Sequence, residues 1–135
     1  HRADLVIAYI VNSEARSWFR LFLSGWFTSI YCFVFDVHIK YINGAPMYSV
    51  AWLKKLAPFH STRYSLLAEI HVKMLRSGVS YLEIDGYLKP SKKSSAMKIG
   101  TLIDVIRSFL KLFYEVRFAN AGHYALKPTR ILPND

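Results

Sequence analysis

The chain has 135 residues, 53% of them hydrophobic and 16% aromatic, which is enough for one domain with its own core. Eighteen basic residues against nine acidic ones give a formal charge of +9, so we expect an anionic partner: a phosphate, a nucleic acid or an acidic lipid headgroup. The single cysteine, Cys32, excludes an internal disulfide. Because the chain opens on His1 and not on Met, we interpret it as an internal piece whose upstream part is not included.

The first predicted element is a strand over residues 4–11. Its apolar run LVI is continuous and does not alternate with polar residues, which favours a strand covered on both faces, as in a parallel sheet. Asn12 or Ser13 can cap the helix that we expect over residues 14–33.

That helix is apolar and aromatic over most of its surface, yet it carries one polar stripe. Arg16, Arg20, Ser24 and Thr28 follow each other at four-residue spacing and therefore lie roughly one above another, with a drift of about 40° per step. The uncharged stretch 21–35 is shorter than the about 20 residues that a membrane-spanning helix needs. The pattern favours a buried helix or one that lies in a membrane interface.

Strands and helices alternate along the rest of the chain. In order, we expect a strand over 37–41, a turn at Asn43-Gly44, a helix over 50–56 capped by Ser49 and ended by Pro58, a helix over 63–76 stopped by Gly78, a strand over 79–88, a loop over 89–95 and a helix over 97–118. The turn-rich segment 121–135 predicts a poorly ordered tail. The sequence therefore predicts an α/β domain over residues 1–120, followed by this tail.

Two groups of residues are candidates for phosphate binding. On the first helix, Arg16 and Arg20 offer guanidinium groups and Ser24 offers a hydroxyl; the alternative is a pair of snorkelling surface arginines. The loop at 89–95 offers Lys89, Lys92 and Ser94 just before a helix N-terminus, where phosphate is favoured. The alternative for this loop is a solvated cationic segment.

Glu69 is the candidate acidic residue, because it lies on an apolar helix face and a buried carboxylate needs a partner. It either pairs with a basic residue or meets a substrate. His60 and His71 lack the spacing of metal ligands, so we assign no metal site to this chain. The sequence contains no G-x-G-x-x-G, P-loop, C-x-x-C, H-E-x-x-H or Asp-x-Asp motif.

Taken in chain order, these segments resemble the second half of a membrane-associated family-2 glycosyltransferase. The matching pieces are ADLVIAYI, the R-L-F-L-S run from Arg20 to Ser24, YINGAPMY, the L-A-E run ending at Glu69 together with Gly78, and YLEID followed by S-S-A from Ser94. The closest branch is the dolichyl-phosphate mannosyltransferase and polyprenyl-phosphate glycosyltransferase group. No piece is specific alone; their order and spacing carry the resemblance over about residues 3–113.

The resemblance implies a partial GT-A-type fold, the second half of a Rossmann-like domain, with an amphipathic interface helix. Its partners would be a nucleotide-sugar donor, a lipid-phosphate acceptor and the cytoplasmic face of a membrane. Arg16, Arg20 and Ser24 would hold the acceptor phosphate, and Lys89, Lys92 and Ser94 would face donor or acceptor phosphates. A Mg²⁺ or Mn²⁺ ion would sit on an upstream Asp-x-Asp, so the chain alone would be inactive.

Several positions depart from the family pattern. Ile10 stands where an arginine is usual, and Lys89 replaces another arginine, which removes bidentate recognition. The general base remains unidentified, since only Glu69 remains in the segment where other branches carry one; an acceptor phosphate that is already ionised needs none. The alternative function is a non-enzymatic basic module that binds membranes or nucleic acid. We expect no nucleic-acid partner, because the aromatic residues cluster in one apolar helix and do not alternate with lysines.

Overall fold

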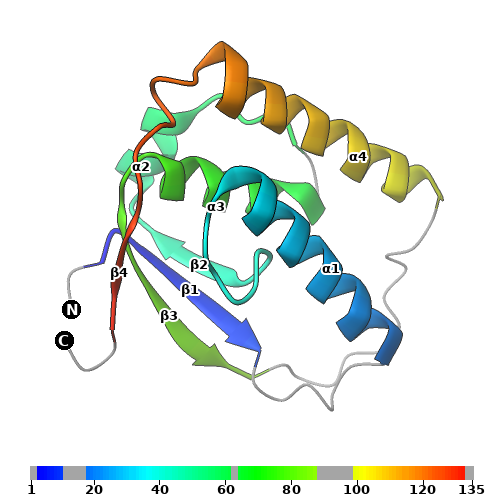
Figure 1. Cartoon of the computed structure of the whole chain (residues 1–135). Coiled ribbons are helices and arrows are strands. Elements are labelled where there is room, and N and C mark those ends of the chain that lie inside the picture. Colours follow the sequence, from blue (N-terminus) through cyan, green and yellow to red (C-terminus); the bar gives the residue numbers. More distant parts are fainter. Residues whose placement is uncertain (1–2, 11–17, 62–63, 88–98, 133–135) are drawn as a thin grey trace.

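A computed structural model describes residues 3–10, 18–61, 64–87 and 99–132 of the chain. The described elements are, in order, β1 (Leu5–Ile10), α1 (Trp18–Phe35), β2 (Ala45–Tyr48), α2 (Val50–Leu56), α3 (Tyr64–Arg76), β3 (Ser80–Gly86), α4 (Ile99–Tyr114), the π-helical segment η2 (Glu115–Ala119) and β4 (Thr129–Ile131). They form an α/β domain in which the helices gather on one side of a mixed sheet (Figure 1). The predicted α/β class is confirmed.

The sheet has the strand order β2-β1-β3-β4. β1 is parallel to β3 and β3 is parallel to β4, whereas β2 is antiparallel to β1 at one edge. Leu5 and Ile7 point into the core and are fully buried, while Val6 and Ala8, on the opposite face, are half-buried. The expectation that β1 is covered on both faces is therefore wrong for the described part of the chain.

The central helix of the domain is α3, which packs against α1, α2 and α4. Its apolar residues Ile70, Met74 and Leu75 enter the core, as their helical spacing predicts. It ends before Gly78, whose φ of +80° suits a residue without a side chain. This helix also buries four ionisable side chains, Glu69, His71, Lys73 and Arg76.

The strand predicted over residues 37–41 is wrong. Val37 and Ile39 are buried as the alternation predicts, but the segment is irregular and bonds to side chains, not to a neighbouring strand. The backbone N–H of Lys40 donates to Glu83 at 2.6 Å, that of Ile42 donates to Thr28 at 3.2 Å, and the His38 carbonyl accepts from the Tyr81 hydroxyl at 2.9 Å. Side-chain partners thus satisfy the polar groups that a second strand would have paired.

The predictions around Asn43-Gly44 and Ser49 are confirmed. The backbone N–H of Gly44 donates to the Tyr41 carbonyl at 3.2 Å and closes the turn. The side chain of Ser49 accepts from the backbone N–H of Trp52 at 3.4 Å and caps α2. The strand β2 was not predicted; it contains Pro46 and lies at an edge of the sheet, where prolines are tolerated.

The expectation of a poorly ordered tail after residue 120 is wrong within the part that the structure describes. Tyr124 is buried, and its carbonyl accepts from Nε of Arg76 at 2.9 Å. Further on, Thr129 pairs with Ser80, so β4 extends the sheet. The strand β4 has three residues, which are too few to show the alternation of apolar and polar residues that predicts a strand. Their conformation is decided by the pairing with β3.

Candidate functional site

Of the phosphate-binding residues predicted on the first helix, the structure describes the side chain of Ser24. Arg16 and the side chain of Arg20 lie outside the described residues; Ser24 is half-buried one turn after Arg20. Thr28, a further turn on, is buried and accepts the backbone N–H of Ile42. The polar stripe is therefore turned toward the protein interior at its Thr28 end. Lys89, Lys92 and Ser94 lie outside the described residues.

The start of α1 and the carboxyl ends of two parallel strands lie toward the same side of the molecule. β1 and β3 are parallel, and their arrowheads point toward the side of the molecule on which α1 begins (Figure 1). At this edge of β1, the Lys40 ammonium lies over the Tyr9 ring, 4.0 Å from its centroid. Ligands of open α/β sheets bind outside the carboxyl ends of parallel strands. This edge is thus a candidate ligand site.

Glu69 has structural partners. Its carboxylate is fully buried, accepts the backbone N–H groups of His60 at 3.0 Å and Ser61 at 3.3 Å, and lies 3.8 Å from Nζ of Lys73. These bonds fix the connection between α2 and α3. The geometry of Glu69 therefore favours structural pairing over contact with a substrate.

The two histidines considered above have different surroundings. His60 is exposed, whereas His71 is buried, and burial lowers the pKa of its imidazole to about 4. Nδ1 of His71 is paired with the carbonyl oxygen of Ile42. Among the described residues, no group of three or more His, Cys, Asp or Glu side chains could hold a metal ion. They do not fit the divalent ion that the resemblance implies, and no metal chemistry is assigned to them.

Large apolar side chains lie exposed along α1 and α4. On α1 they are Trp18, Phe22, Trp26, Ile30 and Phe33; on α4 they are Leu102, Ile103, Ile106, Leu110 and Tyr114. Trp18 is 77% exposed and Phe33 is 89% exposed. The two helices meet at their C-terminal halves, where the rings of Tyr31 and Phe109 are 5.1 Å apart. None of the described helices has the length and hydropathy to cross a bilayer.

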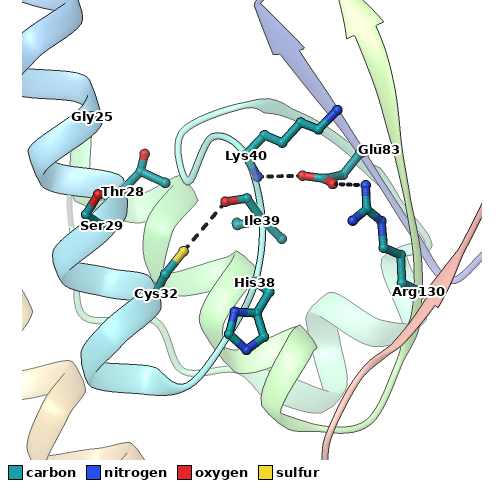
Figure 2. A pocket seen from close by; sticks show the side chains of 9 residues that line it. All are labelled: Gly25, Thr28, Ser29, Cys32, His38, Ile39, Lys40, Glu83 and Arg130. Atoms are coloured by element: carbon teal, nitrogen blue, oxygen red, sulfur yellow. Dashed lines mark hydrogen bonds and ion pairs between the residues drawn. The ribbon is translucent and has the colours of Figure 1, made fainter.

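A pocket of about 450 Å³ opens between α1 and the β4 side of the sheet (Figure 2). Four elements line it: α1 supplies Gly25, Thr28, Ser29 and Cys32, the following irregular segment supplies His38, Ile39 and Lys40, β3 supplies Glu83, and β4 supplies Arg130. We call it the Lys40–Arg130 pocket. It was not predicted from the sequence, because Arg130 falls in the segment interpreted as a tail. Glu83 offered the only signal, as one of two alternating acidic residues along a strand.

A buried carboxylate organises the polar side of this pocket. Glu83 accepts the backbone N–H of Lys40 through Oε1, and its Oε2 lies 3.0 Å from Nη2 of Arg130. The Glu83 side chain is 2% exposed, whereas that of Arg130 is 47% exposed, so solvent meets the guanidinium and not the carboxylate. On the opposite wall, the Cys32 thiol donates to the carbonyl of Ile39 at 3.6 Å, and burial raises its pKa. This thiol is therefore held in its neutral, unreactive form.

Comparison of the chain with protein-family models, with curated proteins and with solved structures found no match.

Proposed function

We propose that the chain is the acceptor-binding part of a membrane-associated, GT-A-type glycosyltransferase of family 2. Such an enzyme transfers a sugar from a nucleotide-sugar to a lipid-phosphate acceptor. The ordered resemblance of the sequence segments supports this function, and the α/β fold is compatible with it. Arg16, Arg20 and Ser24 would hold the acceptor phosphate, and Lys89, Lys92 and Ser94 would face phosphate groups beside it.

The observation that carries the proposal is the placement of α1. This helix follows β1, begins on the side of the molecule toward which the parallel strands β1 and β3 point, and exposes aromatic side chains along its length. Aromatic side chains, Trp above all, favour the headgroup layer of a membrane. An amphipathic helix that lies in this layer presents its polar flank to lipid headgroups. Arg20 and Ser24 on this helix would then meet a lipid phosphate at the carboxyl edge of the sheet.

The acceptor phosphate would be held by charge-assisted hydrogen bonds from guanidinium groups, supplemented by the Ser24 hydroxyl. A phosphate oxygen that is already ionised can attack the sugar without a protein base. This agrees with the structural pairing of Glu69, which leaves that carboxylate buried and bonded to backbone N–H groups. The donor and its metal ion would be bound by residues upstream of this chain.

The test is sugar transfer by the full-length protein, with a polyprenyl phosphate acceptor in detergent micelles and Mg²⁺ or Mn²⁺ present. We expect transfer, and we expect Arg20→Ala to raise the KM for the acceptor by about tenfold or more, because one charged contact to phosphate is lost. Arg107→Ala is the matched control, since Arg107 is exposed on α4. The proposal fails if no sugar is transferred, or if R20A and R107A have the same acceptor KM.

The second candidate function is a non-enzymatic peripheral membrane module. The exposed apolar stripe on α4 favours it, because this stripe adds to that of α1 without any link to sugar transfer. Binding of the full-length protein to anionic vesicles, with no transfer and no response to any nucleotide-sugar, would favour this module over the transferase.

A further inference from the structure

We propose that the Lys40–Arg130 pocket is a binding site for a phosphate group. The proposal uses none of Arg16, Arg20 and Ser24: Ser24 is not among the lining residues, and Arg16 and the side chain of Arg20 lie outside the described residues. The inference therefore does not depend on the transferase activity, and the two can fail separately. A phosphate group could come from a soluble phosphate ester or from a lipid headgroup, and the chemistry of recognition is the same for both.

The first argument is the distribution of charge across the pocket. Lys40 and Arg130 carry positive charge at the pocket, where the Arg130 side chain is 47% exposed and the Lys40 ammonium also lies over the neighbouring Tyr9 ring, 4.0 Å from its centroid. The one carboxylate among the lining residues, Glu83, lies beneath them and is almost fully buried. An approaching anion therefore meets the cationic side chains before it comes near the Glu83 carboxylate. The carboxylate is buried and interacts mainly with Arg130 and the backbone N–H of Lys40.

The second argument is that Glu83 fixes the arginine in place. In Figure 2 the guanidinium of Arg130 reaches from β4 toward Glu83. The ion pair uses Nη2, at 3.0 Å from Oε2 of Glu83. The Arg130 side chain is 47% exposed, so the rest of its guanidinium faces solvent. A guanidinium held by a carboxylate on one side and open on the other is suited to accept phosphate oxygens.

The third argument is the size and chemistry of the pocket. Its volume of about 450 Å³ lies within the range of small-molecule sites. The α1 wall offers the exposed hydroxyl of Ser29 as a further donor, and a Cβ at Gly25 would meet no atom within 4 Å, so this wall leaves room for a ligand. Trp26 and Ile30 adjoin the wall in sequence and are exposed, so an acyl chain attached to the phosphate would find apolar surface nearby.

The test is titration of the full-length, isotope-labelled protein with inorganic phosphate at constant ionic strength, followed by NMR of the backbone amides of residues 38–40 and 129–131. We expect saturable shifts of these amides. Arg130→Gln should raise the dissociation constant for phosphate by about tenfold, because it removes a charge-assisted contact to the anion. Lys54→Gln is the matched control: it changes the net charge equally at an exposed lysine of α2 outside the pocket.

Lys40→Gln keeps the test decisive if R130Q disturbs β4. The bond from Lys40 to Glu83 uses the backbone N–H, so K40Q leaves it intact and removes only the ammonium. K40Q should also weaken phosphate binding, by several-fold. The proposal is overturned if the shifts do not saturate, or if R130Q and K40Q bind phosphate as tightly as K54Q does.

A second titration identifies the source of the phosphate group. Short-chain phosphatidic acid below its micelle concentration should compete with inorganic phosphate for the same amides. Tighter binding of the lipid than of inorganic phosphate supports a lipid-headgroup site, and equal binding supports a site for a soluble ester. A lipid that shifts only amides of α1 and α4, and does not compete with phosphate, overturns the lipid source.

Discussion

The ammonium of Lys73 lies 3.0 Å from a carboxylate oxygen of Glu115, and this ion pair ties α3 to the end of the last helix. Lys73 is fully buried, and its other partners are the Pro58 carbonyl at 2.9 Å and Glu69 at 3.8 Å. One side chain thus joins the connection between α2 and α3, the helix α3 itself and η2. The C-terminal part of the domain depends on a charge at its centre.

We expect Lys73→Met to lower the free energy of unfolding by about 3 kcal/mol or more, because two carboxylates would lose their shared cation in a buried site. Urea unfolding measures the change. The double variant K73M/E115Q should recover part of the loss, since it removes one of the two uncompensated charges. Equal stability of K73M and the unmodified protein would contradict this role.

His71 should make the domain less stable in acid. Its folded pKa of about 4 lies below the ordinary value of 6.5, so between these two pH values only the unfolded chain takes up a proton. The contribution of neutral His71 is fully present above pH 6.5 and is lost as the pH falls toward 4, by about 3 kcal/mol in total.

The check is urea unfolding of the unmodified protein and of His71→Asn at pH 7 and pH 5. The asparagine amide can replace Nδ1 as a donor to Ile42 but does not titrate, so the variant should lose less stability on acidification. Ile70→Val, at a neighbouring buried position, lowers stability without adding or removing a titrating group and serves as the control. Equal pH dependence in all three proteins would exclude His71 as the cause.

Gly44 should not tolerate a side chain. A Cβ at this position would lie 2.2 Å from the carbonyl oxygen of Ala8 and 2.8 Å from Cγ2 of Ile7. Gly44→Ala must therefore push the turn away from β1, and we expect a loss of about 2–3 kcal/mol in thermal or urea unfolding. Gly122→Ala is the control, because a Cβ there meets nothing within 4 Å; similar stabilities of the two variants would contradict the close approach.

The aromatic stripe of α1 should bind membranes without contributing to folding. Trp26 is 57% exposed, so we expect Trp26→Ser to change stability by less than about 0.5 kcal/mol. It should weaken vesicle binding by about tenfold in a flotation assay, since an apolar side chain leaves the interface. Met47→Ser, at a comparably exposed position on the edge strand β2, should leave binding unchanged; equal losses in both variants would contradict a membrane-facing α1.

Local patterns were sufficient to predict the α/β class and the elements with clear boundaries. The Ser49 cap and Pro58 bracket α2, and Gly78 follows α3, so the sequence carries the signals that begin or end these helices. The alternation of Val37 and Ile39 reports burial correctly. It does not indicate that the backbone N–H groups of Lys40 and Ile42 bond to the side chains of Glu83 and Thr28, which lie elsewhere in the chain.

The Lys40–Arg130 pocket shows why the rest could not be predicted. Its residues come from four elements and meet only when β4 joins β3 and the irregular segment folds between α1 and the sheet. No short spacing links Lys40 to Arg130, and neither belongs to a recognised motif. The helix carrying Arg20 and Ser24, by contrast, was predicted from its own local pattern, though their role in binding stays a prediction.

The strand β4 also prevents self-association of the protein through the edge of β3. It pairs with the outer side of β3, while Arg76 secures the preceding turn through the carbonyl of Tyr124. A chain shortened after Ala119 would uncover the edge of β3 at Ser80–Leu82 and leave the Glu83 carboxylate without its arginine. Unpaired strand edges recruit strands from other molecules. Such a shortened protein would tend to self-associate into aggregates, so the last strand is as necessary for solubility as for the pocket.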